Sequence, residues 1–153
     1  AAKVLKDGGS IDDAMAAAKS IEERAALWGS LSTLRYLAMG GRVSSLTAGI
    51  ANMLNIKPIL TMGHGKLEML EKVRTQKKAW RRMIELVEEK LGDKRIEKVA
   101  LLHVACEDDA KKFEAMLREK IELPEEVFIC SMTAGLSVHT GAGLVGITIV
   151  IAE

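Results

Sequence analysis

One histidine lies among small and hydroxyl-bearing residues, a composition typical of binding loops. His139 is followed by Thr140 and lies between Gly135 and Gly146, in a segment that we predict to be the loop before the last strand. Loops at strand ends carry binding and catalytic residues more often than other parts of a fold. The residue types alone favour a functional role for His139 no more than a packing role.

An arginine between glycines and serines is the second candidate. Arg42 follows Gly40 and Gly41 and precedes Ser44 and Ser45. A guanidinium beside small residues and free backbone N–H groups can hold a carboxylate or a phosphate through two parallel hydrogen bonds. The alternative is an ordinary surface arginine that follows the C-terminus of a helix.

The remaining patterns argue against metal, nucleotide and nucleophilic chemistry. The histidines His64, His103 and His139 are far apart and lack metal-ligand spacing with Cys, Asp or Glu. We expect His103 to be a packing residue of a strand and His64 to be exposed in a turn. The glycines from Gly141 to Gly146 match the spacing of a dinucleotide-binding loop, but a strand rather than a helix follows them. Because no pair of nucleophile and base stands out either, we predict that the chain is not an enzyme and needs no cofactor.

A basic stretch has three interpretations. It can be a solvated helix face balanced by the glutamates that follow, a docking face for an acidic protein, or a nucleic-acid patch. The formal net charge of the chain is only +1, which disfavours nucleic acid. Six basic residues lie within this stretch: Lys72, Arg74, Lys77, Lys78, Arg81 and Arg82.

The order of predicted elements indicates a two-layer α/β domain with a mixed sheet. Helices and strands alternate in the second half of the chain, and a turn at 63–66 joins two antiparallel strands. Thr75 is expected to cap a helix that ends at Gly92, and Asp108 to cap another that closes before Pro124. The predicted helices are 11–28, 33–39, 43–54, 75–91 and 108–123, and the predicted strands are 57–62, 67–73, 98–106, 127–132 and 144–152.

Composition agrees with one folded domain. The 153 residues are 48% hydrophobic, 28% charged and 3% aromatic, which excludes intrinsic disorder and makes an aromatic stacking platform improbable. No apolar run approaches the ~20 residues of a membrane helix, and no secretory signal opens the chain. We expect Cys106 and Cys130, both within predicted strands, to be reduced thiols of a cytoplasmic protein.

Four motifs in order resemble the DegV family of bacterial fatty-acid-binding proteins. The last differs from the family pattern because Ala142 replaces the usual proline. The motifs are Leu34-Arg-Tyr-Leu-Ala-Met-Gly-Gly-Arg42-Val-Ser44, Leu54-Asn-Ile-Lys-Pro-Ile-Leu60, the stretch from Leu70-Glu-Lys-Val-Arg74 through Gln76-Lys-Lys-Ala79, and Gly135 to Gly146 with His139-Thr-Gly-Ala-Gly143.

The resemblance implies that this chain is the C-terminal α/β domain of a two-domain carrier. Residues 1–30 would be an interdomain helix or arm and residues 31–153 the domain itself. The N-terminal domain of the family would be missing, and the first residue, Ala rather than Met, favours a fragment. A long-chain fatty acid would lie between the two domains.

The same resemblance implies roles for particular residues. His139 would hydrogen-bond the carboxylate of the fatty acid, with Thr140 beside it, and Arg42 would lie near the head group. Apolar residues between Val43 and Leu60 would contribute to the tunnel for the tail. A partner fatty acid kinase would convert the bound ligand into an acyl phosphate, and Lys77, Lys78, Arg81 and Arg82 form a candidate docking face for it.

Two alternatives remain open at this stage. One is a small-molecule-binding subunit similar to that of dihydroxyacetone kinases, and the other is a basic interaction or nucleic-acid-binding module. Retention of a fatty acid rather than a triose separates the first alternative from the DegV reading. Because one wall of the tunnel would be absent, we expect residues 1–153 alone to retain little or no fatty acid, and the exposed apolar face to favour self-association.

Overall fold

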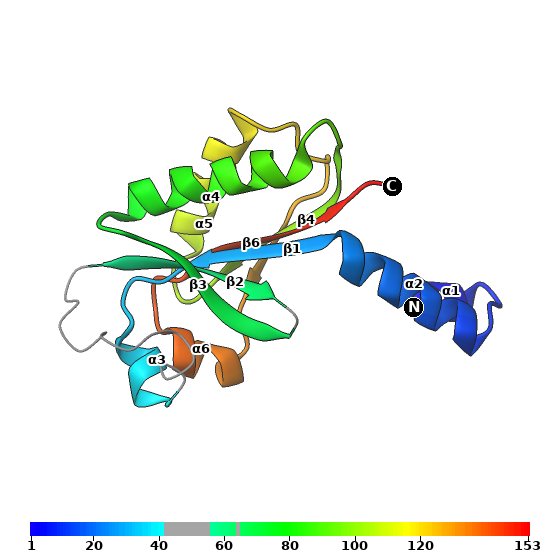
Figure 1. Cartoon of the computed structure of the whole chain (residues 1–153), viewed down its shortest axis with the longest axis horizontal. Helices are drawn as coiled ribbons and strands as arrows, with labels where there is room; N and C mark the ends of the chain where they lie inside the picture. Colours follow the sequence, from blue (N-terminus) through cyan, green and yellow to red (C-terminus); the bar gives the residue numbers. More distant parts are fainter. Residues whose placement is uncertain (42–55, 64) are drawn as a thin grey trace.

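A six-stranded mixed sheet forms the centre of the fold in the computed structural model, which describes residues 1–41, 56–63 and 65–153 (Figure 1). Two long helices cover one face of the sheet, and two short helices lie under the other face. The predicted α/β class with a mixed sheet is therefore confirmed. The strands are β1 (Ala25–Ser30), β2 (Lys57–Gly63), β3 (Lys66–Val73), β4 (Ile96–His103), β5 (Phe128–Ser131) and β6 (Val145–Ile151). The helices are α1 (Ala2–Lys6), α2 (Ile11–Arg24), α3 (Arg35–Met39), α4 (Gln76–Leu91), α5 (Glu107–Arg118) and α6 (Ala134–Thr140).

The first and last strands of the sheet, β1 and β6, lie next to each other in its middle. The order is β3-β2-β1-β6-β4-β5. Neighbouring strands are antiparallel except β4 and β5, which pair in parallel. The hairpin predicted at 63–66 is present and joins β2 to β3.

The first strand corrects the predicted helix over 11–28. Helix α2 ends at Arg24, and the next residues form β1, with Trp28 buried on the face covered by α4. The short apolar run that begins at Ala25 fits the periodicity of a helix as well as that of a strand, so pairing with β2 and β6 decides its conformation.

The segment after β4 corrects three further expectations. The strand ends at His103, and Ala105 has a positive φ of 51°, which turns the chain into α5. Cys106 is therefore the N-cap of α5 rather than a strand residue, and Asp108 lies in the first turn rather than at the cap. The helix ends at Arg118, well before Pro124.

The predicted ends of α4 are confirmed. The Thr75 hydroxyl accepts a hydrogen bond from the backbone N–H of Lys78, and Gly92 ends the helix with a φ of +54°. Glycine adopts this conformation at little cost because it lacks a Cβ.

Two apolar clusters hold the layers together. The larger one lies between the sheet and helices α4 and α5, where the rings of Trp80 and Phe113 are 6.0 Å apart. The smaller one lies between the opposite sheet face and α3, and consists of Leu31, Leu34, Leu37, Leu60, Val104 and Leu144. Helices α1 and α2 extend away from the sheet as an arm (Figure 1). The arm is anchored at Arg24, which forms an ion pair with Glu97 at 2.5 Å and donates a hydrogen bond to the carbonyl of Ile151.

Candidate functional site

Helices α3 and α6 meet under the sheet through two reciprocal contacts at their C-terminal glycines. Gly40 ends α3 and lies against the imidazole of His139, so closely that a Cβ on Gly40 would overlap Nδ1. Gly141 ends α6 and lies against the ring of Tyr36, which a Cβ on Gly141 would overlap in the same way. Each helix therefore needs a glycine where the aromatic side chain of the other helix packs.

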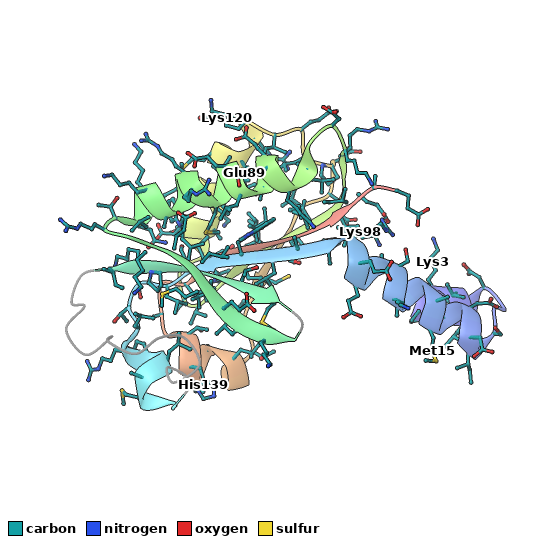
Figure 2. The ribbon with its side chains drawn as sticks, viewed as in Figure 1. Lys3, Met15, Glu89, Lys98, Lys120 and His139 are labelled. Atoms are coloured by element: carbon teal, nitrogen blue, oxygen red, sulfur yellow. The ribbon has the colours of Figure 1, made fainter. Side chains whose placement is uncertain are left out.

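The position of His139 differs from the prediction. It lies in the last turn of α6, beneath the sheet, rather than in a loop (Figure 2). The residues from Thr133 to Gly143 suggest a loop because glycines and hydroxyl side chains dominate them. Their small size instead lets a short helix approach α3.

Thr140 is less well prepared than His139 to bind a carboxylate. Its hydroxyl donates a hydrogen bond to the carbonyl of Leu136, at 3.3 Å. A carboxylate accepts hydrogen bonds and does not donate them, so the Thr140 hydroxyl would have to rotate to serve it. The role of Thr140 stays a prediction.

Arg42 lies outside the described residues. The turn that precedes it is described, and Gly41 in this turn has a φ of +68°. Through Gly40, the structure brings this turn against His139. Two of the sequence motifs, far apart in the chain, therefore meet at one place.

Two polar contacts that the sequence did not reveal tie the loops around α3 and α6 together. The Ser32 hydroxyl donates to the carbonyl of Ala142, at 2.6 Å, and Lys57 Nζ donates to the carbonyl of Ser32, at 2.7 Å. The backbone N–H of Gly143 donates to the carbonyl of Val104. Lys57, Ala142 and Gly143 lie within the quoted motifs, whereas Ser32 and Val104 lie outside them.

The sheet face above α3 and α6 is apolar and lacks side chains at its centre. Gly29 and Gly146 pair directly on β1 and β6, and strand alternation turns both toward this face. A Cβ on Gly146 would lie 3.7 Å from the Cβ of Leu102 on β4. Farther from the helices, the same face exposes Met62 and Phe128, at 48% and 51% of their surfaces. The face therefore offers an apolar strip that the described helices cover only in part.

The predicted tunnel segment 43–60 is described only at its end. Leu60 belongs to the cluster under the sheet, whereas Ile59 packs on the opposite face with α4. Residues 43–54, predicted to be a helix, lie outside the described residues.

Arg82 is engaged within the chain, unlike the other three residues of the candidate docking face. Its guanidinium bonds Glu71 at 2.7 Å, Glu85 at 3.0 Å and Glu89 at 2.8 Å, and these carboxylates raise its pKa. Lys77, Lys78 and Arg81 are exposed and form no ion pair within the described part of the chain. Docking through these residues stays a prediction.

The other histidine that the structure describes is buried, as expected. His103 ends β4 on the face covered by α5, is 7% exposed, and its Nδ1 has no hydrogen-bond partner in the described structure. Among residues 1–41, 56–63 and 65–153, no group of three or more His, Cys, Asp and Glu side chains is arranged to hold a metal ion. No described helix is long and apolar enough to cross a membrane. The cytoplasmic location stays a prediction.

The fold is an α/β domain built on a mixed sheet, and comparison with known proteins identifies its family. The family model described as "Uncharacterised protein, DegV family" matches residues 1–152. This chain belongs to the DegV family, as its four motifs indicated.

The similar proteins are longer than this chain. A DegV domain-containing protein of Streptomyces coelicolor is 32% identical over 149 residues, which cover 97% of this chain and 53% of that protein. A DegV family protein of Corynebacterium glutamicum has a structure with a TM-score of 0.90 and 27% identity, covering 99% of this chain and 57% of that chain. The structure of a fatty acid binding DegV family protein of Streptococcus agalactiae matches with a TM-score of 0.83 and 30% identity, covering 99% of this chain and 53% of that one. The chain thus spans about half the length of the curated relatives that it matches.

Proposed function

We propose that this chain forms the C-terminal wall of a long-chain fatty-acid site and that His139 binds the carboxylate. The observation that carries the proposal is the fixed position of His139 between α6 and the Gly40 turn, beside an incompletely covered apolar sheet face. The similarity to the fatty acid binding protein of Streptococcus agalactiae supports the ligand class. The preceding domain of a two-domain protein would supply the other wall.

The apolar strip suits an acyl tail. Gly29 and Gly146 remove side chains from the centre of the sheet face, while Leu60 and Leu102 border it. Each buried CH₂ contributes about 0.8 kcal/mol, so a long tail supplies most of the affinity. A triose has no such tail, and this favours a fatty acid over the dihydroxyacetone-like alternative.

The imidazole suits the head group. Nδ1 of His139 faces Gly40, so Nε2 is the ring nitrogen left to donate to a carboxylate oxygen. Arg42, two residues after Gly40, would place a second donor nearby. The bound fatty acid is then held with its carboxylate at the edge of the domain.

We assign the chain a carrier role rather than a catalytic one. Presentation of the carboxylate to a partner kinase would lead to an acyl phosphate, and the kinase would supply the chemistry. Lys77, Lys78 and Arg81 are the cations available for docking, since Arg82 is held by three glutamates.

The test is a ligand titration of the 153-residue chain followed by NMR. Decanoate labelled with ¹³C at the carboxyl is compared with butyrate, which has the same head group and almost no tail, and with dihydroxyacetone. We expect weak binding of decanoate alone, and a clear loss of the carboxyl shift change in His139→Gln. Organic extraction of the purified chain should yield less than one fatty acid per molecule. Equal binding of butyrate and decanoate, or an unchanged response in His139→Gln, would contradict the proposal.

A further inference from the structure

Nothing within the described residues requires a glycine at position 29. Gly29 lies inside β1, a central strand of the sheet, where glycine is unfavourable because it packs no side chain and loses more backbone freedom than other residues. Its φ is not positive, so a side chain here would not strain the backbone. An added Cβ would meet only the Cα of Gly146, at 3.9 Å, and the carbonyl oxygen of Val145, at 4.0 Å. Both distances are ordinary van der Waals contacts.

The strand pair itself explains the glycine opposite, Gly146. A Cβ on Gly146 would lie 3.1 Å from the carbonyl oxygen of Trp28, a main-chain atom of the neighbouring strand that cannot rotate away. Close approach of the two backbones therefore accounts for Gly146 but not for Gly29. A glycine inside a strand that neither backbone geometry nor packing explains is typical of a place where a ligand approaches the main chain.

The two glycines form the bare centre of a row of residues that crosses the sheet on the face of α3 and α6 (Figure 1). In order from β3 to β4, the row consists of Met69, Leu60, Gly29, Gly146 and Leu102. The three residues with side chains all belong to the apolar cluster under the sheet or pack against it. Because neighbouring strands are about 4.8 Å apart, the backbones of Leu60 and Leu102 are separated by roughly 14 Å across the bare centre.

The room beneath Gly29 suits an apolar occupant. Gly29 is buried, yet no side chain in the described part of the chain lies within 4 Å of its added Cβ. Thr148, the next residue of β6 on this face, donates its hydroxyl to the carbonyl of Ala26, at 3.2 Å. A buried water needs about two to four polar partners, and aliphatic side chains border this place. An alkyl chain fits here better than water or a polar ligand.

We propose that Gly29 is a specificity-determining residue of the fatty-acid site, where the tail lies against bare backbone and the size of the residue selects among tail lengths. This inference rests on the proposed fatty-acid function and adds to it the residue that discriminates between ligands. Leu31, two residues after Gly29 on the same face, packs with Leu37 of α3. Gly29 is therefore next to the covered end of the face, where α3 and α6 hold His139. A short tail that starts at His139 ends within the covered part, whereas a long tail extends beneath Gly29.

Two substitutions at this position test the proposal in the 153-residue chain. Carboxyl-labelled decanoate and hexanoate are titrated by NMR into the wild type, Gly29→Ala and Gly29→Val. Each buried CH₂ that loses its place costs roughly fourfold in affinity, so alanine should weaken decanoate binding by about fourfold and valine by about tenfold or more. Hexanoate should bind all three proteins alike. Ala25→Val, a change on the same face and strand about 13 Å away, is the matched control and should bind decanoate as the wild type does.

Urea unfolding without ligand separates a blocked tail from a damaged fold. Gly29→Ala should unfold at the same urea concentration as the wild type or at a higher one, because its methyl group meets nothing closer than 3.9 Å. Alanine therefore keeps the test decisive even if valine lowers stability.

Two outcomes would overturn the inference while leaving the fatty-acid function intact. In the first, the wild type prefers decanoate to hexanoate and both Gly29 variants keep the same preference. In the second, the variants lose both ligands by the same factor, so that position 29 does not discriminate between tails. If the wild type instead binds decanoate no better than hexanoate, the proposed function itself fails, and the inference fails with it.

Discussion

Replacing Gly141 with alanine tests the reciprocal packing that positions His139. Gly141 has φ 74° and ψ 167°, a region that residues other than glycine rarely adopt, at about 1–3 kcal/mol of strain. The new methyl group would also displace the ring of Tyr36. Because Tyr36 is partly exposed, we expect the ring to move for about 1 kcal/mol more, at the low end of overpacking costs. The sum is a destabilisation of roughly 2–4 kcal/mol.

Urea unfolding of the full chain, followed by tryptophan fluorescence, measures this cost. Gly65→Ala is the control, because Gly65 also has a positive φ, +73°, but no atom lies within 4 Å of its added Cβ. It should cost only about 1 kcal/mol of backbone strain. In a Tyr36→Ala background, Gly141→Ala should lose its steric part, so the two substitutions should couple by about 1 kcal/mol. Equal costs of Gly141→Ala in both backgrounds would refute the contact with Tyr36.

Two further predictions concern side chains outside this contact. Arg82→Gln should lower the free energy of unfolding by about 1 kcal/mol, because it breaks a network of three ion pairs. The control Arg81→Gln should change this free energy by less than about 0.5 kcal/mol. Equal effects of the two substitutions in urea unfolding would exclude a stabilising network. Burial raises the pKa of the Cys106 thiol, whereas Cys130 is exposed on the edge strand β5, so a thiol reagent at neutral pH should modify Cys130 first and Cys106 only at higher pH. Cys130→Ser should then abolish the fast phase, and a fast phase that persists would contradict this assignment.

The elements predictable from the sequence were those with local signals at both ends. Helix α4 has a Thr75 cap, a regular apolar stripe and a Gly92 stop, and the structure reproduces all three. The β2–β3 hairpin has an equally local turn. Strand β1 has no such signal, because its conformation depends on partners elsewhere in the chain.

The conformation of helix α6 and the surroundings of His139 also depend on residues elsewhere in the chain. The glycines and hydroxyl residues around His139 predicted a loop, and only the space left by Gly40 on another helix explains why a short helix forms there. The sequence motifs identified His139 as a candidate but not its contact with the Gly40 turn. Of the partners of Arg82, Glu85 and Glu89 follow it on the same helix, as one interpretation of the basic stretch indicated, whereas Glu71 lies on β3 and could not be predicted.

The pairing of β1 with β6 at the middle of the sheet has a consequence for folding. Because β1 pairs with β6, the sheet is complete only after residue 151 has left the ribosome. Such distant pairing costs loop entropy before it yields contacts, so we expect this sheet to form slowly. During synthesis, strands β1 and β4 lack the strand that lies between them, and loss of the last few residues would remove a central strand rather than an edge.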